Sequence, residues 1–97
     1  MMTIDQKTEF EVIGNLENRT AKAIFKGKKD RVLRIYDKVE QMFTKGSETT
    51  RSIIVIAYIL PLSQLLEMNY SWGKPYLDLL PKHLRVEYCR QINKSGI

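Results

Sequence analysis

Apolar residues recur at three- and four-residue steps along most of this chain, which is the spacing of an α-helix that buries one face. The clearest such stretch lies between Asp30 and Gly46, and its apolar positions fall on one side of a helix: Val32, Ile35, Tyr36, Val39, Met42 and Phe43. We expect Asp30 to cap the start of this helix and Gly46 to end it, because short polar side chains accept hydrogen bonds from a first turn and glycine commonly stops helices.

Two helices are expected before residue 30. The first holds its apolar residues between Phe10 and Leu16 at helical spacing and ends near Gly14. The second is short, spans residues 20–25 and is followed by Gly27, which can adopt the left-handed conformation that closes many helices. The amino-terminal third is therefore predicted to be a pair of separate helices.

The middle of the chain predicts one long helix. Ser47 is suited to cap its start, and residues 53–60 form an uninterrupted apolar run rich in β-branched side chains. Such a run is typical of a buried strand or a buried helix, but the apolar pattern continues to Met68, which makes the element too long for an ordinary strand. Pro61 should kink or break this helix, because proline lacks the backbone N–H and its ring presses on the preceding turn.

The last third is expected to begin with a loop at residues 69–75, where aromatic and polar residues mix with glycine and proline. A short helix should follow from Pro75 to residue 80. A final helix should start at Pro81, with three apolar residues on one face: Leu84, Tyr88 and Ile92. Residues 1–97 are thus predicted to form one compact all-α domain, a bundle of four to six helices around the long central one.

Composition places the chain among soluble globular domains. Of its 97 residues, 43% are hydrophobic and 28% are charged, which is far from the composition of disordered chains. A single cysteine, Cys89, cannot form an internal disulfide, so we expect a reducing cytoplasm. The apolar run at residues 53–60 is too short to cross a bilayer, which takes about 20 residues, so no membrane contact is expected.

Catalytic and metal-binding residues are scarce. His83 is the only histidine and Cys89 the only cysteine, and no serine or lysine lies in a recognisable nucleophile motif. We therefore expect a protein that is not an enzyme, with His83 as an ordinary polar residue in the first turn of the last helix. One histidine and one cysteine among scattered carboxylates offer no ligand spacing, and no glycine-rich phosphate loop occurs, so neither a metal nor a cofactor is expected.

Positive charge is concentrated in one part of the chain. The net charge is +5, and lysines and arginines cluster between Arg19 and Arg34 against a single acid, Asp30. Such a cluster can bind phosphates or simply face water. In a nucleic-acid-binding or regulatory protein, the phosphate contacts would be Lys22, Lys26, Lys28, Lys29, Arg31 and Arg34. Phe25, the one aromatic residue among them, has a spacing that suits a core residue as well as a base-stacking platform.

Three aromatic residues, Tyr70, Trp72 and Tyr76, lie outside any periodic apolar face. Tryptophan and tyrosine supply much of the binding energy in protein interfaces, so these residues form a candidate partner-binding site. In the other interpretation, Trp72 fills the gap between the central helix and the last helix.

Several segments together carry a family resemblance. They are Asp30-Arg31-Val32-Leu33-Arg34-Ile35-Tyr36, Ser47-Glu48-Thr49-Thr50-Arg51-Ser52-Ile53-Ile54-Val55 and Leu79-Leu80-Pro81-Lys82. The order of a helix, a short glycine turn, a long apolar helix and shorter terminal helices, over residues 30–85, resembles small helical bacterial immunity proteins. The resemblance rests on apolar spacing and carries no diagnostic motif.

The resemblance implies the immunity partner of a contact-dependent growth inhibition toxin. Such a protein is cytoplasmic, binds its cognate toxin domain, often a nuclease, and occludes it without activity of its own. The toxin contacts would be Trp72, Tyr70, Tyr76, Asp37 and Glu40.

Charge leaves two versions of this hypothesis open. Inhibitors of nucleases are expected to be acidic, because nucleases tend to be basic, whereas this chain is basic. Either the toxin surface is acidic, or the contact uses acids outside the basic cluster, such as Asp37, Glu40, Glu48 and Glu67. Self-association through the apolar residues 53–66 into a homodimer also stays open.

Overall fold

The computed structural model describes residues 4–95, with side chains described for residues 7–91. The elements in chain order are α1 (Ile4–Phe25), α2 (Lys29–Lys45), α3 (Glu48–Ile54), the π-helical turn η1 (Val55–Ile59), α4 (Leu60–Met68), α5 (Tyr70–Asp78) and α6 (Lys82–Ser95). Over these residues the predicted all-α bundle is confirmed. Its radius of gyration is 13.0 Å, close to the roughly 13 Å of a compact chain of this length.

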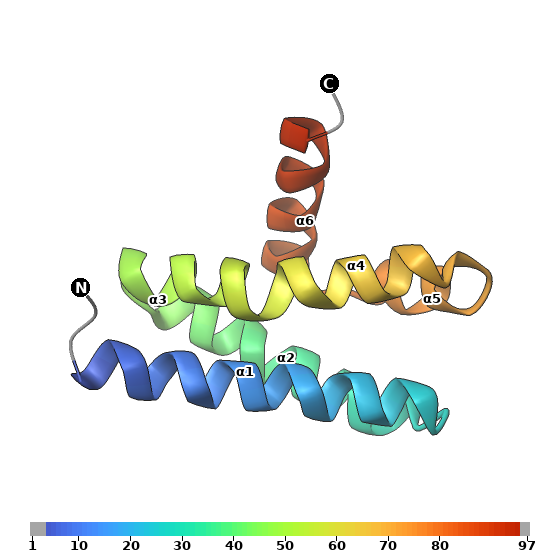
Figure 1. Ribbon diagram of the computed structural model, residues 1–97, viewed down its shortest axis with the longest axis horizontal. Coiled ribbons are helices and arrows are strands. Elements are labelled where there is room, and N and C mark those ends of the chain that lie inside the picture. Colours follow the sequence, from blue (N-terminus) through green and yellow to red (C-terminus); the bar gives the residue numbers. More distant parts are fainter. Residues whose placement is uncertain (1–3, 96–97) are drawn as a thin grey trace.

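The helices surround one shared core. In Figure 1, α1 and the central helix lie side by side, α2 lies behind them, and α6 rises away from this layer. Apolar residues from all of these helices are buried together, and burial of each large side chain stabilises the fold by roughly 1.5–3 kcal/mol. The fully buried apolar residues among them are Ile13, Val32, Tyr36, Val39, Ile54, Tyr58, Leu62, Leu66 and Leu84.

One buried polar pair joins α1 to the central helix. The Thr20 hydroxyl donates to the carbonyl oxygen of Leu16 at 2.8 Å, and its oxygen lies 2.7 Å from the Tyr58 hydroxyl. Because the single Thr20 proton is used on Leu16, Tyr58 must be the donor to Thr20. Burial raises the pKa of Tyr58 well above its ordinary value, so the phenol stays protonated as a donor.

The two helices predicted before residue 30 are one helix, and the predicted end near Gly14 is wrong. A side chain at Gly14 would meet no atom within 4 Å, so this glycine lies in the helix without shaping a turn. The buried positions Ile13, Leu16, Thr20 and Ala23 continue at helical spacing across the predicted gap. Burial of this continuous face outweighs the weak helix preference of glycine, which costs about 1 kcal/mol relative to alanine.

The sequence predicted a capping residue for the start of α2 and one for the start of the central helix, and only the second prediction is correct. Lys28, and not Asp30, is the residue before α2, and Asp30 lies in the first turn, where its charge favours the helix dipole. The predicted cap at Ser47 is confirmed, since its hydroxyl oxygen accepts the backbone N–H of Thr50 at 3.2 Å. Gly46 ends α2 as predicted.

The central helix runs without a break from Glu48 to Met68. The helix does not break at Pro61, which was one of the two outcomes predicted there, a kink or a break. A π turn precedes the proline, and in it the N–H of Leu60 donates to the carbonyl of Val55. Such wider turns are irregularities within continuous helices, and this one lies just before Pro61, the second residue of α4. Within the described residues, this is the one helix that meets the length and composition of a membrane span, a test that core helices also pass.

The loop predicted at residues 69–75 is wrong, because α5 already begins at Tyr70 and includes Pro75. The structural reason is Gly73, which is buried against the backbone of Leu66 so closely that a Cβ atom would lie 2.8 Å from the Leu66 Cα. This approach packs α5 on α4 and forms the helix through a tertiary contact. The last helix, α6, is confirmed from Lys82 onward, with Leu84 buried; the side chain of Ile92 lies outside the described residues.

Candidate functional site

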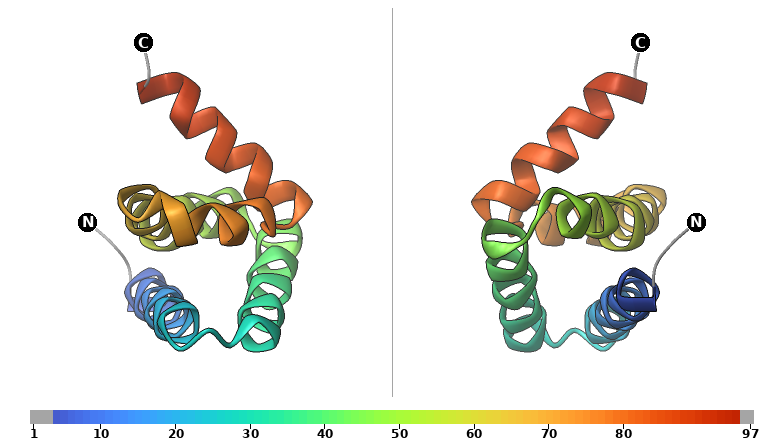
Figure 2. Two further views of the ribbon diagram at one scale, coloured as in Figure 1. Left: turned by 90° about the vertical axis from the view of Figure 1, so that its right-hand side faces the viewer. Right: turned by 90° about the vertical axis from the view of Figure 1, so that its left-hand side faces the viewer.

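The turn between α1 and α2 sets the geometry of the candidate site. Gly27 has a φ of +68°, its N–H donates to Ile24 at 3.0 Å, and the N–H of Lys28 donates to Ala23 at 2.8 Å. This pair of bonds is the glycine-closed helix end expected from the sequence. It reverses the chain within three residues, so α2 folds back beside α1, and Figure 2 shows the two helices joined by this short turn.

A groove runs between these two helices. Its first hollow has a volume of about 430 Å³ and is lined by Arg19, Lys22, Ala23, Lys26, Arg31 and Ile35. A neighbouring hollow of about 470 Å³ is lined by Val12, Asn15, Leu16, Asn18, Arg19, Lys22 and Lys38. The two hollows share Arg19 and Lys22. We call the whole the cationic groove and define it by its charged lining, Arg19, Lys22, Lys26, Arg31 and Lys38.

The lining of the cationic groove contains no acid, and none of its cations takes part in an ion pair among the described side chains. Among the side chains described, the ion pairs are Lys74–Asp78, His83–Glu40 and Arg90–Glu87, and none involves a groove residue. Like charges in such proximity repel one another and create a strong positive potential in a concave site. The groove is therefore suited to an anionic ligand.

An exposed aromatic pair includes Phe25, the chain neighbour of the groove residue Lys26. The rings of Phe25 and Trp72 have centroids 5.4 Å apart and planes tilted by 58°, an edge-to-face arrangement that is favourable for aromatic rings. Phe25 is 64% exposed and Trp72 is 36% exposed. The core interpretation of Phe25 is therefore wrong. Trp72 contacts α1 at this pair, and more than a third of its surface remains accessible to a partner.

The predicted aromatic contacts are only partly brought together. Tyr70 and Trp72 are exposed on the first turn of α5. Tyr76 is half-buried and packs against the core, and its carbonyl accepts the hydroxyl proton of Tyr36 at 2.9 Å. Tyr70 and Trp72 therefore remain available to a partner, whereas Tyr76 is engaged inside the fold.

Glu40 has a structural role that its sequence position did not reveal. Its carboxylate accepts the backbone N–H groups of His83 at 3.0 Å and Leu84 at 3.2 Å, and one oxygen lies 2.8 Å from His83 Nδ1. Glu40 thus caps the start of α6 from the neighbouring helix α2. Burial raises the pKa of the carboxyl, but the bonds from His83 and Leu84 outweigh burial and lower the pKa below its ordinary value of 4.5.

Two further candidate acids also have partners within the protein. Asp37 accepts a hydrogen bond from the Gln41 amide at 3.1 Å, and Glu67 accepts one from the Tyr88 hydroxyl at 2.6 Å. Glu48 lies in the first turn of α3, where its charge favours the helix dipole. Asp37 and Glu40 lie on α2 and the aromatic candidates on α5, so the predicted set comes from two different helices.

The predicted phosphate-binding set divides in two. Lys22, Lys26 and Arg31 line the cationic groove, whereas Lys28, Lys29 and Arg34 are exposed without lining it. Arg19 and Lys38 belong to the groove but were not among the predicted contacts. The sequence did carry a signal for both residues. Arg19 lies three residues before Lys22 and seven before Lys26, and Lys38 lies seven residues after Arg31, so each shares a helix face with other groove cations.

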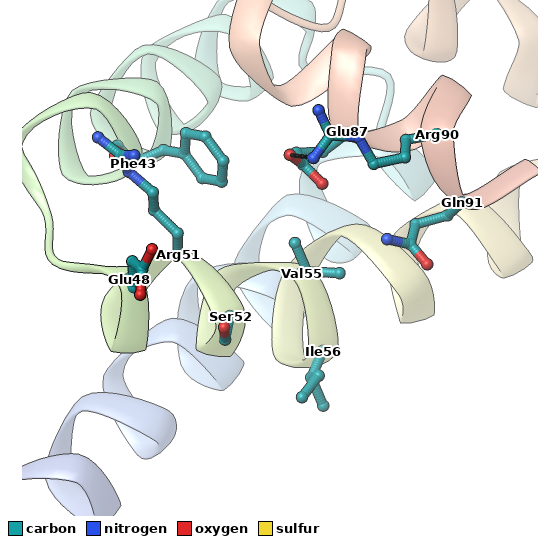
Figure 3. Close-up of a pocket in the computed structure, with 9 residues that line it drawn as sticks. All are labelled: Phe43, Glu48, Arg51, Ser52, Val55, Ile56, Glu87, Arg90 and Gln91. Atoms are coloured by element: carbon teal, nitrogen blue, oxygen red, sulfur yellow. Dashed lines mark hydrogen bonds and ion pairs between the residues drawn. The ribbon is translucent and has the colours of Figure 1, made fainter. Parts of the chain in front are cut away.

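A third hollow, outside the cationic groove, lies between the central helix and α6 and has a volume of about 610 Å³. Figure 3 shows the ion pair of Glu87 and Arg90 on one wall and Arg51 beside Phe43 on the other. Arg51 donates to the carbonyl of Phe43 at 3.0 Å and lies over its ring. The charges of this hollow are balanced by one another, so it is a weaker candidate for a charged ligand.

The residues singled out for chemistry do not gather. His83 uses Nδ1 on Glu40, and Cys89 is an exposed thiol on α6. Among the described side chains, no group of three or more potential metal-ligating residues occurs.

Residues 2–94 match the model of a protein family described as a domain of unknown function (DUF7674). The match spans both helices of the cationic groove and the aromatic pair. No curated protein and no solved structure matches this chain significantly.

Proposed function

We propose that this chain, which belongs to the DUF7674 family, is a binding protein of the immunity type that occludes a toxin protein in the cytoplasm. The observation that carries the proposal is the exposed pair of Phe25 and Trp72, in which Phe25 is the chain neighbour of the groove residue Lys26. Large aromatic side chains flanked by arginine are the composition of interface hot spots. An accessible tryptophan held in place by a second ring loses little freedom on binding.

Occlusion is a mechanism that needs no reactive group. The titratable residues singled out by the sequence are engaged in holding helices together, Glu40 and His83 at α6 and Glu67 on Tyr88. A reducing cytoplasm suits the exposed free thiol of Cys89, which would be prone to oxidation elsewhere. These features support binding without catalysis as the mode of action.

Nucleic-acid binding is the rival function, and the cationic groove is the observation that favours it. Five clustered cations can neutralise phosphates and release counterions. Such binding would weaken steeply with salt, whereas an interface anchored by aromatic residues would depend on salt mainly through its rate of association.

The test is affinity capture of the tagged protein from its native cells at moderate and at high salt. We expect one stoichiometric protein that stays bound at high salt. Trp72→Ala should weaken its binding by roughly 2 kcal/mol, about 30-fold. Val86→Ala serves as the control, because Val86 is an exposed apolar residue on α6. Equal capture by Trp72→Ala, or capture of nucleic acid that salt releases, would contradict the proposal.

A further inference from the structure

We propose that the cationic groove between α1 and α2 receives an acidic, amphipathic segment of the protein partner. This inference rests on the proposed function and names the chemistry of the surface that the partner presents. It also selects between the two versions of the immunity hypothesis that the sequence left open, an acidic toxin surface or contacts made by acids of this chain.

The acids named as possible contacts are already partly engaged within the fold. Asp37, Glu40 and Glu67 accept hydrogen bonds from Gln41, His83 and Tyr88, which leaves these carboxylates fewer acceptor sites for a basic partner. The five groove cations, in contrast, have no ion-pair partner among the described side chains. Complementary charge for this protein must therefore come mainly from an acidic partner.

The surface between the groove cations is aliphatic. Ala23 and Ile35 line the first hollow, and Val12 and Leu16 line the second. Sites for single-stranded nucleic acid stack bases on aromatic side chains inside the groove, and no aromatic residue lines either hollow. Aliphatic surface beneath a ring of cations instead matches a segment that alternates carboxylates with side chains such as leucine.

The aromatic pair lies close to one end of the groove in the chain. Lys26 lines the groove, and Phe25, its neighbour in the chain, contacts Trp72. A long partner segment that extends beyond Lys26 could therefore reach the exposed rings. The groove would then supply steering and register, and the rings would supply the desolvated anchor, a division of roles common in protein interfaces.

The experiment uses the full chain and two probes labelled with a fluorophore. One is an amphipathic peptide of alternating glutamate and leucine segments; the other is a single-stranded oligothymidylate with the same number of negative charges. Fluorescence anisotropy at physiological salt compares the wild type with the groove variant Arg19→Glu/Arg31→Glu. The matched control, Lys7→Glu/Lys45→Glu, changes the net charge equally at exposed positions outside the groove. Circular dichroism verifies that all variants stay helical.

We expect the peptide to bind more tightly than the oligonucleotide, and the groove variant to lose about tenfold or more in peptide affinity while the control stays within about threefold. Tighter binding of the oligonucleotide, also lost in the groove variant, would make the groove a nucleic-acid site and overturn the proposal. An equal loss in the groove variant and the control would also overturn it, because only overall charge would then matter. If the groove variant unfolds, the milder variant Arg19→Gln/Arg31→Gln replaces it, and its peptide affinity is compared with that of the wild type and interpreted by the same outcomes.

The outcomes of these experiments separate a wrong groove assignment from a wrong proposed function. A peptide short enough to occupy the groove alone does not reach the aromatic pair, so Trp72→Ala should bind it like the wild type. A groove that binds the peptide in a protein whose captured partner ignores Trp72 would leave the groove assignment standing and remove the occlusion mechanism. If the peptide does not bind but the captured partner still depends on Trp72, the occlusion mechanism stands and the groove assignment is removed.

Discussion

Phe25 at the end of α1 and Trp72 in the first turn of α5 lie with their ring centroids 5.4 Å apart on the protein surface. A double-mutant cycle with Phe25→Ala and Trp72→Ala should give a coupling free energy of about 0.5–1.5 kcal/mol, because the ring contact is worth that much beyond burial. Urea denaturation of the four proteins measures the coupling. Strictly additive effects would mean that the rings do not support each other in solution.

The two glycines inside helices should respond in opposite ways to a methyl group. Gly14→Ala should raise the free energy of unfolding by about 0.5–1 kcal/mol, since the added atom meets nothing within 4 Å and alanine favours the helix. Gly73→Ala should lower it by roughly 1–3 kcal/mol, because its Cβ would overlap the carbonyl of Leu66. Thermal and chemical denaturation of both variants provide the comparison, and a tolerated Gly73→Ala would speak against the close packing of α5 on α4.

The buried pair Thr20 and Tyr58 predicts an asymmetry between its two conservative variants. Thr20→Val would leave the Tyr58 hydroxyl buried without an acceptor, at a cost of roughly 1–3 kcal/mol. Tyr58→Phe would leave the Thr20 hydroxyl with its bond to Leu16, so its cost should be smaller, about 1 kcal/mol. Chemical denaturation measures both, and a costlier Tyr58→Phe would reverse the assigned donor.

Capping of α6 by Glu40 predicts a pH dependence of stability. Because the pKa of Glu40 is lowered in the folded protein, its contribution is present above the ordinary value of 4.5 and is lost as the pH falls through the lower folded value. Glu40→Gln should therefore cost about 1 kcal/mol near pH 6 and progressively less toward pH 3. A difference from the wild type that stays constant over this range would exclude Glu40 as an ionised cap.

The elements that sequence predicted well carry their signals locally. The apolar face of α2, the Ser47 cap and the closure of α1 at Gly27 depend on residues within one or two turns, and all three are present. The wrong predictions, a loop at residues 69–75 and a helix end near Gly14, come from reading glycine and proline as local breaks. Packing of Gly73 on Leu66 and the continuous buried face of α1 override those preferences.

The candidate site was predictable only in pieces. The basic cluster and Trp72 stood out in the sequence, and helical spacing put Arg19 and Lys38 on faces shared with other groove cations. Nothing local indicated that Phe25 would lie beside Trp72, or that the cations of α1 and α2 would line one groove. These relationships arise from the reversal at Gly27 and the docking of α5, which bring distant segments together. The capping role of Glu40 is likewise a contact between α2 and α6 that spacing along one helix cannot reveal.

The most direct test of the central claim is site-specific photocrosslinking in the native cells. A benzophenone amino acid at position 25 should give one discrete protein adduct, because this exposed ring faces the partner in our account. The same group at position 49, an exposed site on α3 at the other end of the layer, should give none. Adducts to nucleic acid from position 25, or the same protein adduct from both positions, would contradict a protein partner bound at the aromatic pair and the cationic groove.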